Sequence, residues 1–213
     1  MDVEIFEVGP FAENTYLLSS NGEGILVDPG FFEPREYNTF RDHLEKKSIQ
    51  LQAIVLTHAH VDHVLGLERV LKDFPLPVYL NHSDLFLWEN FPNQSAMFGV
   101  RTAGFDFIPE PFPEKRNHSI GNFTFDVLHT PGHSPDHVSL YFEKYNTLIA
   151  GDVLFYESIG RTDLYKGDFN ELADTIRSKL YTLPDETVVY PGHGPKTTIG
   201  HEKVNNSFVR AAD

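Results

Sequence analysis

The stretch from Thr57 to His63 constrains the fold of this chain more than any other feature of its sequence. It follows the apolar run Ala53–Leu56 and precedes a segment, 64–71, whose apolar residues recur at helical spacing. The pattern predicts a buried strand, a tight loop and a helix. Because open α/β sheets place their sites at the carboxyl ends of strands, we expect a functional site at this loop. The loop carries three imidazoles, His58, His60 and His63, and one carboxylate, Asp62.

Imidazole and carboxylate groups in such a cluster indicate a metal site, because they suit zinc, iron or manganese. A histidine-rich loop with satisfied hydrogen bonds is the alternative, and the density of potential ligands in one turn argues against it. A short cluster cannot close a metal site alone, so further ligands must come from downstream. The chain contains no cysteine. Thiolate zinc sites, iron–sulfur clusters and disulfides are therefore excluded, and nitrogen and oxygen must hold any metal.

Three later strands are each expected to end near a residue that binds metals. The strands are predicted at 123–128, 148–150 and 187–190, and the residues are His133, Asp152 and His193. Glycine or proline precedes most of these residues, as a sharp turn requires. If the strand ends converge on one edge, the chain builds a site for two ions, which lie about 3.5–4 Å apart in such centres.

The predicted ligands form two sets joined by one carboxylate. Asp152 has two oxygens and is expected to bridge the two ions. The first ion is assigned His58, His60 and His133, and the second is assigned Asp62, His63 and His193.

The rest of the pattern predicts strands and helices around this site. Residues 1–30 form a strand meander with a hairpin turn at Asn21-Gly22. The meander ends at Asp28, which is either a turn residue or a carboxylate that orients a metal-bound imidazole. Helices are expected at 34–47, at 84–89 with Ser83 as cap, and at 169–183 with Asp168 near the start. The segment 91–117 is expected to be irregular, serving as a lid or as a cover for the core.

Charge and hydropathy limit the partners of the protein. The net charge of −14 disfavours a nucleic-acid partner, which needs clustered Lys and Arg. No stretch approaches the roughly 20 apolar residues that span a bilayer, so no membrane partner is expected. The N-terminus carries acidic residues where a signal peptide carries Lys or Arg. We therefore expect a cytoplasmic protein.

Four motifs resemble, in order and spacing, those of the metallo-β-lactamase superfamily. They are His58-Ala59-His60-Val61-Asp62-His63, Thr130-Pro131-Gly132-His133, Gly151-Asp152 and Gly192-His193. The resemblance covers nearly the whole chain and implies an α/β fold of the αββα type, a four-layer sandwich of two mixed β-sheets with helices outside. A single domain over residues 1–213 is expected. The resemblance also implies the metal ligands given above, an orienting role for Asp28, and a supporting role for His137 beside the ligands.

Three further stretches are similar to the short bacterial glyoxalase II-type hydrolases, of the hydroxyacylglutathione hydrolase group. They are 151–155, 158–163 and 191–195. This resemblance implies hydrolysis of thioesters such as S-D-lactoylglutathione by a hydroxide that bridges two divalent metal ions. Zinc is expected, with iron or manganese as alternatives, and Asp62 and Asp152 are expected to take part in catalysis. Glyoxalase II proper adds a C-terminal helical domain for glutathione, which we expect this chain to lack.

Substrate recognition is predicted at the loop that follows Asp152. Arg161 is expected to clamp a substrate carboxylate bidentately, with Tyr156 as a neighbour. The alternative for each is an ordinary surface residue. The expected partner is a small thioester built on glutathione or on another low-molecular-weight thiol, and the expected assembly is a monomer or homodimer.

Other readings of the same residues remain open. Persulfide dioxygenases resemble the chain at 160–163 and bind a single iron through positions that match His58, His133 and Asp152, although the motif at 191–194 favours the hydrolase. A lactonase or β-lactamase is a second alternative, and a nuclease is disfavoured by the acidic balance. A non-catalytic protein with this fold predicts damaged ligand positions, and all candidate positions here are intact.

Overall fold

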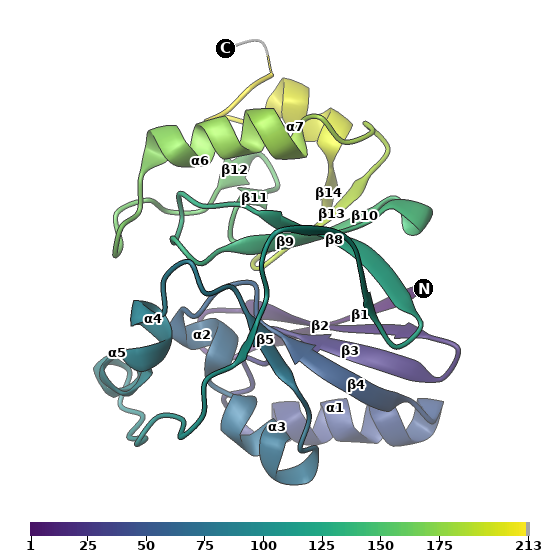
Figure 1. Cartoon of the computed structure of the whole chain (residues 1–213), viewed down its shortest axis with the longest axis vertical. Coiled ribbons are helices and arrows are strands. Elements are labelled where there is room, and N and C mark those ends of the chain that lie inside the picture. Colours follow the sequence, from purple (N-terminus) through teal and green to yellow (C-terminus); the bar gives the residue numbers. More distant parts are fainter. Residues whose placement is uncertain (212–213) are drawn as a thin grey trace. The chain divides into compact units, whose positions relative to one another are not determined.

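Two six-stranded mixed β-sheets form the framework of the protein in this computed structural model, which describes residues 1–211 (Figure 1). The chain divides into two units, and each holds most of one sheet. Unit 1 comprises Met1–Phe112 and Ser119–Phe123, and unit 2 comprises Pro113–His118 and the chain from Thr124 onward. The predicted fold class, two mixed sheets with helices, is confirmed. The expectation of a single domain stays a prediction.

The sheet of unit 1 has the strand order β1-β2-β3-β4-β5-β6. The predicted meander is confirmed, because β1, β2 and β3 pair antiparallel. Its hairpin uses Asn21 and Gly22, both at positive φ, the conformation that a two-residue turn of this kind requires. From β3 to β6 the pairing is parallel. The strands are β1 (Asp2–Val8), β2 (Glu13–Ser20), β3 (Glu23–Val27), β4 (Gln50–Val55), β5 (Val78–Leu80) and β6 (Glu110–Pro111).

Helix α1 (Pro34–Lys47) has the predicted bounds. Proline at its first turn and a capping box between Glu33 and Glu36 fix its start. The single helix expected after the histidine motif is instead two, α2 (Val61–Val64) and α3 (Leu67–Asp73). They separate at Gly66, whose backbone N–H donates to the carbonyl of Pro29 at 2.8 Å. Helices α1 and α3 lie along one face of the unit 1 sheet (Figure 1).

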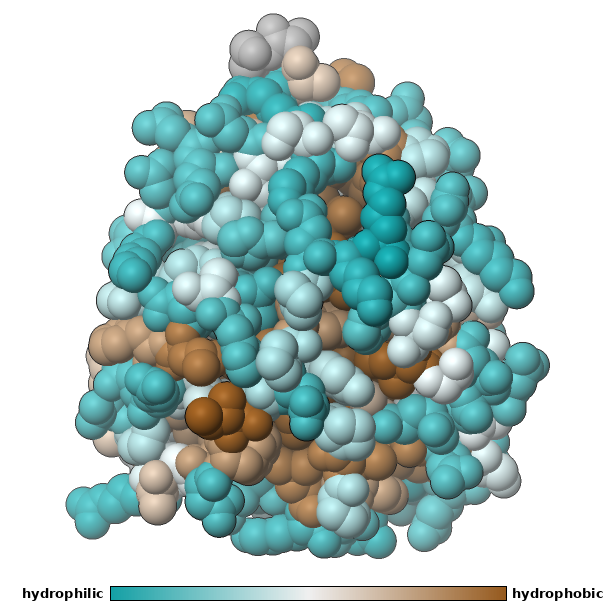
Figure 2. All heavy atoms as spheres, viewed as in Figure 1, coloured by the Kyte–Doolittle hydropathy of each residue, from teal (hydrophilic) through white to brown (hydrophobic). Residues whose placement is uncertain are grey.

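Helix α4 (Phe86–Glu89) lies within the predicted range, but Ser83 does not cap it. The N–H of Phe86 donates instead to Oδ1 of Asp84 at 2.8 Å. The segment expected to be irregular begins with helix α5 (Phe91–Met97), so that prediction was wrong in part. Its seven residues make about two turns and bury only Phe91 and Ser95, too few to leave a periodic pattern. Figure 2 shows hydrophobic surface gathered over α4, α5 and the segment after them, where Met97 and Ile108 are exposed.

The sheet of unit 2 has the strand order β14-β13-β10-β9-β8-β7. Helix α6 (Phe169–Thr175) continues as a π-helical turn, Ile176–Leu180, and covers one face of this sheet together with α7 (Ile199–Asn205) (Figure 1). The predicted role of Asp168 as cap is confirmed, since its Oδ1 accepts from the N–H of Glu171 at 2.9 Å. The strands are β7 (Lys115–Ile120), β8 (Phe123–His129), β9 (Val138–Phe142), β10 (Thr147–Gly151), β13 (Val188–Pro191) and β14 (Thr197–Thr198).

A small hairpin, β11 (Leu154–Phe155) with β12 (Ser158–Ile159), follows β10. The buried Glu202 of α7 anchors it, because both carboxylate oxygens accept from the N–H of Glu157 at 3.0 and 3.1 Å. Asn206 adds a bond from its side-chain amide to the carbonyl of Ser158. The loop after this hairpin carries Arg161, so α7 fixes the base of the predicted substrate-binding segment.

Among residues 1–211, no helix combines the length and the apolar character that a bilayer crossing requires.

Candidate metal centre

Unit 1 gathers its four predicted ligands where β4 ends. The rings of His58 and His60 have centroids 4.8 Å apart, and those of His58 and His63 are 4.2 Å apart. Oδ2 of Asp62 lies 3.9 Å from Nε2 of His63. All three histidines are buried, and Asp62 is partly exposed. The parallel strand β4 delivers these side chains together because the helix α2 starts immediately after His60.

Hydrogen bonds that Asp28 accepts set the proton positions of two imidazoles. Its Oδ1 accepts from the Thr57 N–H at 2.7 Å, and its Oδ2 accepts from the Thr57 hydroxyl at 2.6 Å. Because that hydroxyl donates its only hydrogen in the bond to Asp28, it can only accept a hydrogen bond from Nδ1 of His58, 3.0 Å away. Nδ1 of His63 lies 3.0 Å from Asp28 Oδ2 and likewise donates. Both imidazoles therefore carry the proton on Nδ1 and present the lone pair of Nε2, as a metal ligand must.

The turn that holds Asp28 is itself strained and braced. Asp28 has φ 49°, in the left-handed region that few residue types tolerate. The hydroxyl of Thr15 bridges the turn, because it lies 2.7 Å from the Asp28 carbonyl and accepts from the N–H of Gly30 at 3.0 Å. A Cβ at Gly30 would collide with the backbone oxygen of Asp62. The glycine thus permits the close approach of this turn to the helix that carries two predicted ligands.

Glu13 is a buried carboxyl that sequence reasoning missed. Its Oε2 lies 2.8 Å from Oγ1 of Thr15, a hydroxyl whose one proton is shared between this carboxyl and the Asp28 carbonyl. Burial raises the pKa of Glu13 well above its ordinary value, although the nearby His63 and the hydrogen bond from Thr15 act in the opposite direction. Burial therefore favours the neutral form of Glu13.

Glu13, Asp28 and His63 also lie close enough to resemble a separate metal site. The bonds above argue against this, because both oxygens of Asp28 already accept hydrogen bonds. Nδ1 of His63, the ring nitrogen on that side, carries a proton toward Asp28. The three residues form a support for His63 instead.

Replacing Glu13 by glutamine should stabilise the metal-free protein increasingly as the pH rises. A raised acid pKa contributes stability that is full below its unfolded value, near 4.5, and is lost as the pH rises through the folded value. The amide mimics the neutral acid at all pH values and, like it, can donate to Thr15. Denaturant unfolding at pH 5 and pH 8 measures the difference. A Glu13→Gln effect that is the same at both pH values would contradict a neutral Glu13, and Glu13→Ala should destabilise at both.

Unit 2 gathers its three predicted ligands around one oxygen. Oδ2 of Asp152 lies 3.6 Å from Nε2 of His133 and 3.5 Å from Nε2 of His193. Metal–ligand bonds of about 2.0–2.2 Å in tetrahedral geometry place neighbouring ligand atoms about 3.3–3.6 Å apart. The observed separations therefore fit donors that share metal ions. They also place Asp152 Oδ2 beside the nitrogens that were assigned to two different ions.

Backbone groups orient this second set of donors. Nδ1 of His133 donates to the carbonyl of Arg161 at 2.8 Å, so its Nε2 also presents a lone pair. His137 is buried behind Asp152 and accepts from the Asp152 N–H on Nε2 at 2.9 Å. Its Nδ1 therefore carries the proton and donates to the hydroxyl of Thr130 at 2.8 Å. Both ring nitrogens of His137 are engaged, so it holds the backbone of Asp152 and offers no lone pair to a metal.

The donors fit divalent metal ions. They are imidazoles and carboxylates only, and the ring nitrogens that can be assigned present unprotonated Nε2 atoms. This chemistry, together with burial, implies that His and Asp residues of both units bind divalent metals. The assignment of His133 to the same ion as His58 and His60, and of His193 to that of Asp62 and His63, joins residues of the two units and stays a prediction.

The predicted substrate residues lie on the surface of unit 2. The guanidinium of Arg161 is exposed and pairs bidentately with Asp163. Tyr156 is half exposed, and its ring stacks on His201 of α7 with centroids 5.2 Å apart. A hydrogen bond with Glu157 raises the pKa of its hydroxyl. Neither side chain packs in the core, so both can exchange their present contacts for others.

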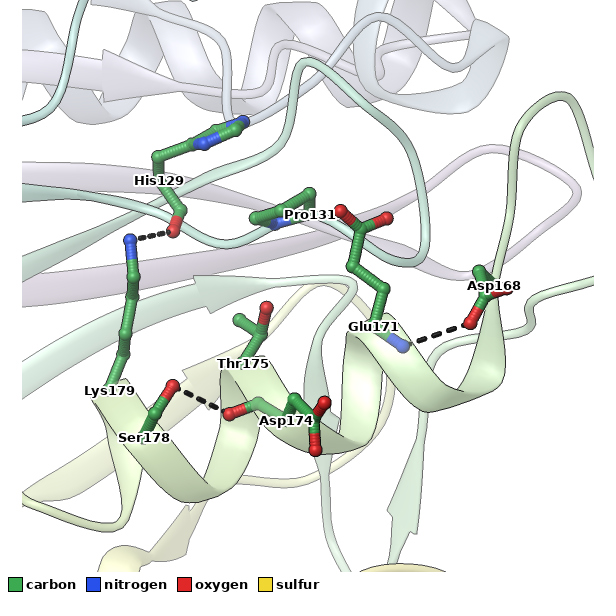
Figure 3. Close-up of a pocket in the computed structure, with 8 residues that line it drawn as sticks. All are labelled: His129, Pro131, Asp168, Glu171, Asp174, Thr175, Ser178 and Lys179. Atoms are coloured by element: carbon green, nitrogen blue, oxygen red, sulfur yellow. Dashed lines mark hydrogen bonds between the residues drawn. The ribbon is translucent and has the colours of Figure 1, made fainter.

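A surface pocket of about 540 Å³ lies beside the end of β8 in unit 2 (Figure 3). None of the predicted ligands lines it. Lys179 donates to the carbonyl of His129 on one side, and Asp168 uses its carboxylate to cap α6 on the other. Its polar groups serve the fold, so it is not the candidate site. Its lining residues are His129, Pro131, Asp168, Glu171, Asp174, Thr175, Ser178 and Lys179.

Sequence reasoning missed residues that act through a neighbour. The hydroxyls of Thr57 and Thr130 accept hydrogen bonds from Nδ1 of His58 and His137 and so fix their tautomers, and Glu13 contacts Thr15 of the Asp28 turn. The pairing of Asp163 with Arg161 had no signal beyond their closeness in the chain.

Comparisons with known proteins show similarity in sequence and in fold. The model of the metallo-beta-lactamase superfamily matches residues 8–193. The chain is 33% identical to hydroxyacylglutathione hydrolase GloC of Haemophilus influenzae, a match that covers 99% of each chain. It is 38% identical to the crystal structure of BLEG-1 B3 metallo-beta-lactamase, with a TM-score of 0.87 over 98% of this chain and 99% of that one. For a di-iron-bound form of TTHA1623, the identity is 36% and the TM-score 0.86, over 97% and 100% of the two chains.

Proposed function

Since this chain belongs to the metallo-beta-lactamase superfamily and is one of its hydrolases, we propose that it cleaves thioesters such as S-D-lactoylglutathione. The observation that carries the proposal is the set of buried imidazoles whose Nε2 lone pairs are fixed by Asp28, Thr57 and Arg161. The full-length similarity to a hydroxyacylglutathione hydrolase supports thioesters as the substrate class.

We propose two divalent ions as the cofactor, zinc in the first place and iron or manganese as alternatives. Similarity to a protein solved in a di-iron-bound form keeps iron open. Asp152 is proposed to bridge the ions and Asp62 to share in catalysis at the second one. The residues proposed to hold the ions are His58, His60, Asp62, His63, His133, Asp152 and His193.

The metal ions would lower the pKa of water toward neutrality, so that hydroxide is available to attack the carbonyl carbon at pH 7. The chain's own residues position this chemistry. Asp28 keeps His63 and, through Thr57, His58 in the ligating tautomer, and His137 holds the backbone of Asp152. A thiol has an ordinary pKa of about 8.5, so the leaving thiolate needs no proton donor. This suits a centre whose described donors are imidazoles and carboxylates.

Arg161→Ala should raise KM for a carboxylate-bearing thioester and change KM for a neutral one much less. The guanidinium offers a fork of donors that matches a carboxylate, and its loss removes a charge-assisted pair that a neutral thioester does not make. Steady-state kinetics with both substrates measure the ratio. An equal rise for the two thioesters would refute the clamp.

A panel of substrates separates this proposal from its alternatives. Similarity to the BLEG-1 B3 metallo-beta-lactamase favours β-lactam hydrolysis as the second candidate. The metal-loaded protein is offered S-D-lactoylglutathione, a lactone, a β-lactam and glutathione persulfide, with oxygen uptake followed for the last. The proposal expects kcat/KM to be highest for the thioester. A higher value for the lactone or the β-lactam, or oxygen uptake by protein with a single iron, would replace it with that activity.

A further inference from the structure

The loop from Gly160 to Gly167 is built onto the donors of unit 2. The carbonyl of Arg161 accepts from Nδ1 of His133 at 2.8 Å. Gly160 packs so closely on the carbonyl of Asp152 that a Cβ there would collide with it. The backbone of Arg161 is therefore held against two predicted ligands, and its side chain starts within one side-chain length of the imidazole of His133.

Backbone bonds close the loop without help from its charged side chains. The N–H of Gly167 donates to the carbonyl of Leu164 at 2.9 Å, and the N–H of Asp168 donates to the carbonyl of Gly132 at 2.8 Å. The loop shape thus does not depend on the ion pair between Arg161 and Asp163.

The guanidinium of Arg161 already pairs with a carboxylate of the same loop, that of Asp163. Nε donates to Oδ1 of Asp163 at 2.7 Å, and Nη2 donates to Oδ2 at 2.9 Å. This two-bond geometry is the one in which arginine recognises carboxylate ligands. The hydrogen bonds from Arg161 lower the pKa of Asp163, so the carboxyl is charged at neutral pH.

The pair is exposed and can be exchanged. The side chains of Arg161 and Asp163 are 61% and 69% accessible, and pairs in that setting are worth little because water and salt screen them. An incoming carboxylate can replace Asp163 at small cost. While Asp163 is in place, however, it offsets the charge of Arg161 on a chain of net charge −14, which weakens attraction for an anionic substrate.

We propose that Asp163 is a specificity-determining residue, an internal carboxylate that occupies the substrate-carboxylate site of Arg161 and is displaced when an anionic thioester binds. The effect on thioester hydrolysis rests on the proposed function. The exchange of Asp163 for another carboxylate at Arg161 rests on the observed ion pair alone. Asp163 thereby sets how strongly the enzyme prefers carboxylate-bearing thioesters over neutral ones. No covalent bond is made or broken in the exchange.

The test compares two thioesters with the same acyl group, S-acetylglutathione, which bears carboxylates, and S-acetyl-N-acetylcysteamine, which is neutral. Asp163→Asn should lower KM for S-acetylglutathione about two- to fivefold relative to KM for the neutral ester. In an Arg161→Ala background the same substitution should have no effect on that ratio. Asp185→Asn is the matched control, because it removes one charge from another exposed ion pair of unit 2, with Lys203. It should leave the ratio as in the wild type.

An equal change for both esters, an effect that persists without Arg161, or the same effect from Asp185→Asn would overturn the proposal. Binding of S-methylglutathione, a thioether that is not hydrolysed, gives a readout separate from activity. Calorimetry on metal-loaded protein should show tighter binding to the Asp163→Asn variant than to wild type, even if no thioester is cleaved. Lack of any tightening, including no binding to either protein, would refute the exchange, whereas tight binding without hydrolysis would refute only the proposed reaction.

Discussion

Replacing Asp152 by alanine is expected to abolish thioester hydrolysis and to lower the bound metal, while both sheets stay folded. Its Oδ2 lies 3.5–3.6 Å from nitrogens of His193 and His133, so its loss removes the carboxylate that these donors surround. The fall in metal affinity should exceed the roughly 10–100-fold that loss of a supporting residue costs. His58→Ala should behave in the same way from unit 1. Turnover, metal per chain and circular dichroism are measured together.

Asp174→Ala is the control for this experiment. Asp174 lies exposed on α6, in the same unit as Asp152, and its carboxylate belongs to none of the predicted ligand sets. It should keep full activity and full metal. Wild-type turnover by Asp152→Ala or His58→Ala protein that has lost its metal would contradict the site assignment.

Substitutions of Asp28 are expected to have the second large effect. Alanine and asparagine at this position should change stability and metal affinity in different ways. Asp28→Ala leaves the buried N–H of Thr57 without its acceptor, which costs about 1–3 kcal/mol, and removes a side chain type that tolerates φ 49°. Asp28→Asn keeps an oxygen for that N–H and tolerates the turn. Its amide NH₂ must then face Nδ1 of His63 and the Thr57 hydroxyl, where the carboxylate had accepted.

The amide therefore reverses the tautomers. Nδ1 of His63 must accept, so the proton moves to Nε2, and the Thr57 hydroxyl turns its proton toward His58. Asp28→Asn should unfold at nearly the denaturant concentration of the wild type but bind metal at least about 10–100-fold more weakly. Asp28→Ala should lower both the stability to denaturant and the metal affinity. Metal affinity by competition with a chelator, paired with urea unfolding of the metal-free proteins, separates the two. An Asp28→Asn variant with wild-type metal affinity would contradict the tautomer argument.

The parts of the fold that could be predicted are those whose signals are local. Helix α1 carries a capping box, an N-terminal proline and the buried triplet Tyr37, Phe40 and Leu44 at helical spacing, so its bounds follow from its own sequence. The ligand residues were visible because each follows an apolar strand. Helix α5 was missed because seven residues with Pro92 near the start leave no clear period.

The supporting residues could not be predicted because their roles depend on long-range contacts. Glu13 meets His63 only after β2 and the end of β4 are brought together, and nothing near Glu13 in the sequence marks it as a neutral acid. The hydrogen bonds through Thr57 likewise depend on where Asp28 lies, 29 residues earlier. Sequence patterns locate donors, whereas the network that fixes their protons is a product of tertiary packing.

We propose that this chain is a metal-dependent thioester hydrolase. The most direct test is the release of free thiol from S-D-lactoylglutathione by metal-replete protein, followed with a chromogenic thiol reagent. We expect thiol release that a chelator stops and that added divalent metal restores. The absence of thiol release by protein with two metal ions confirmed per chain would contradict it.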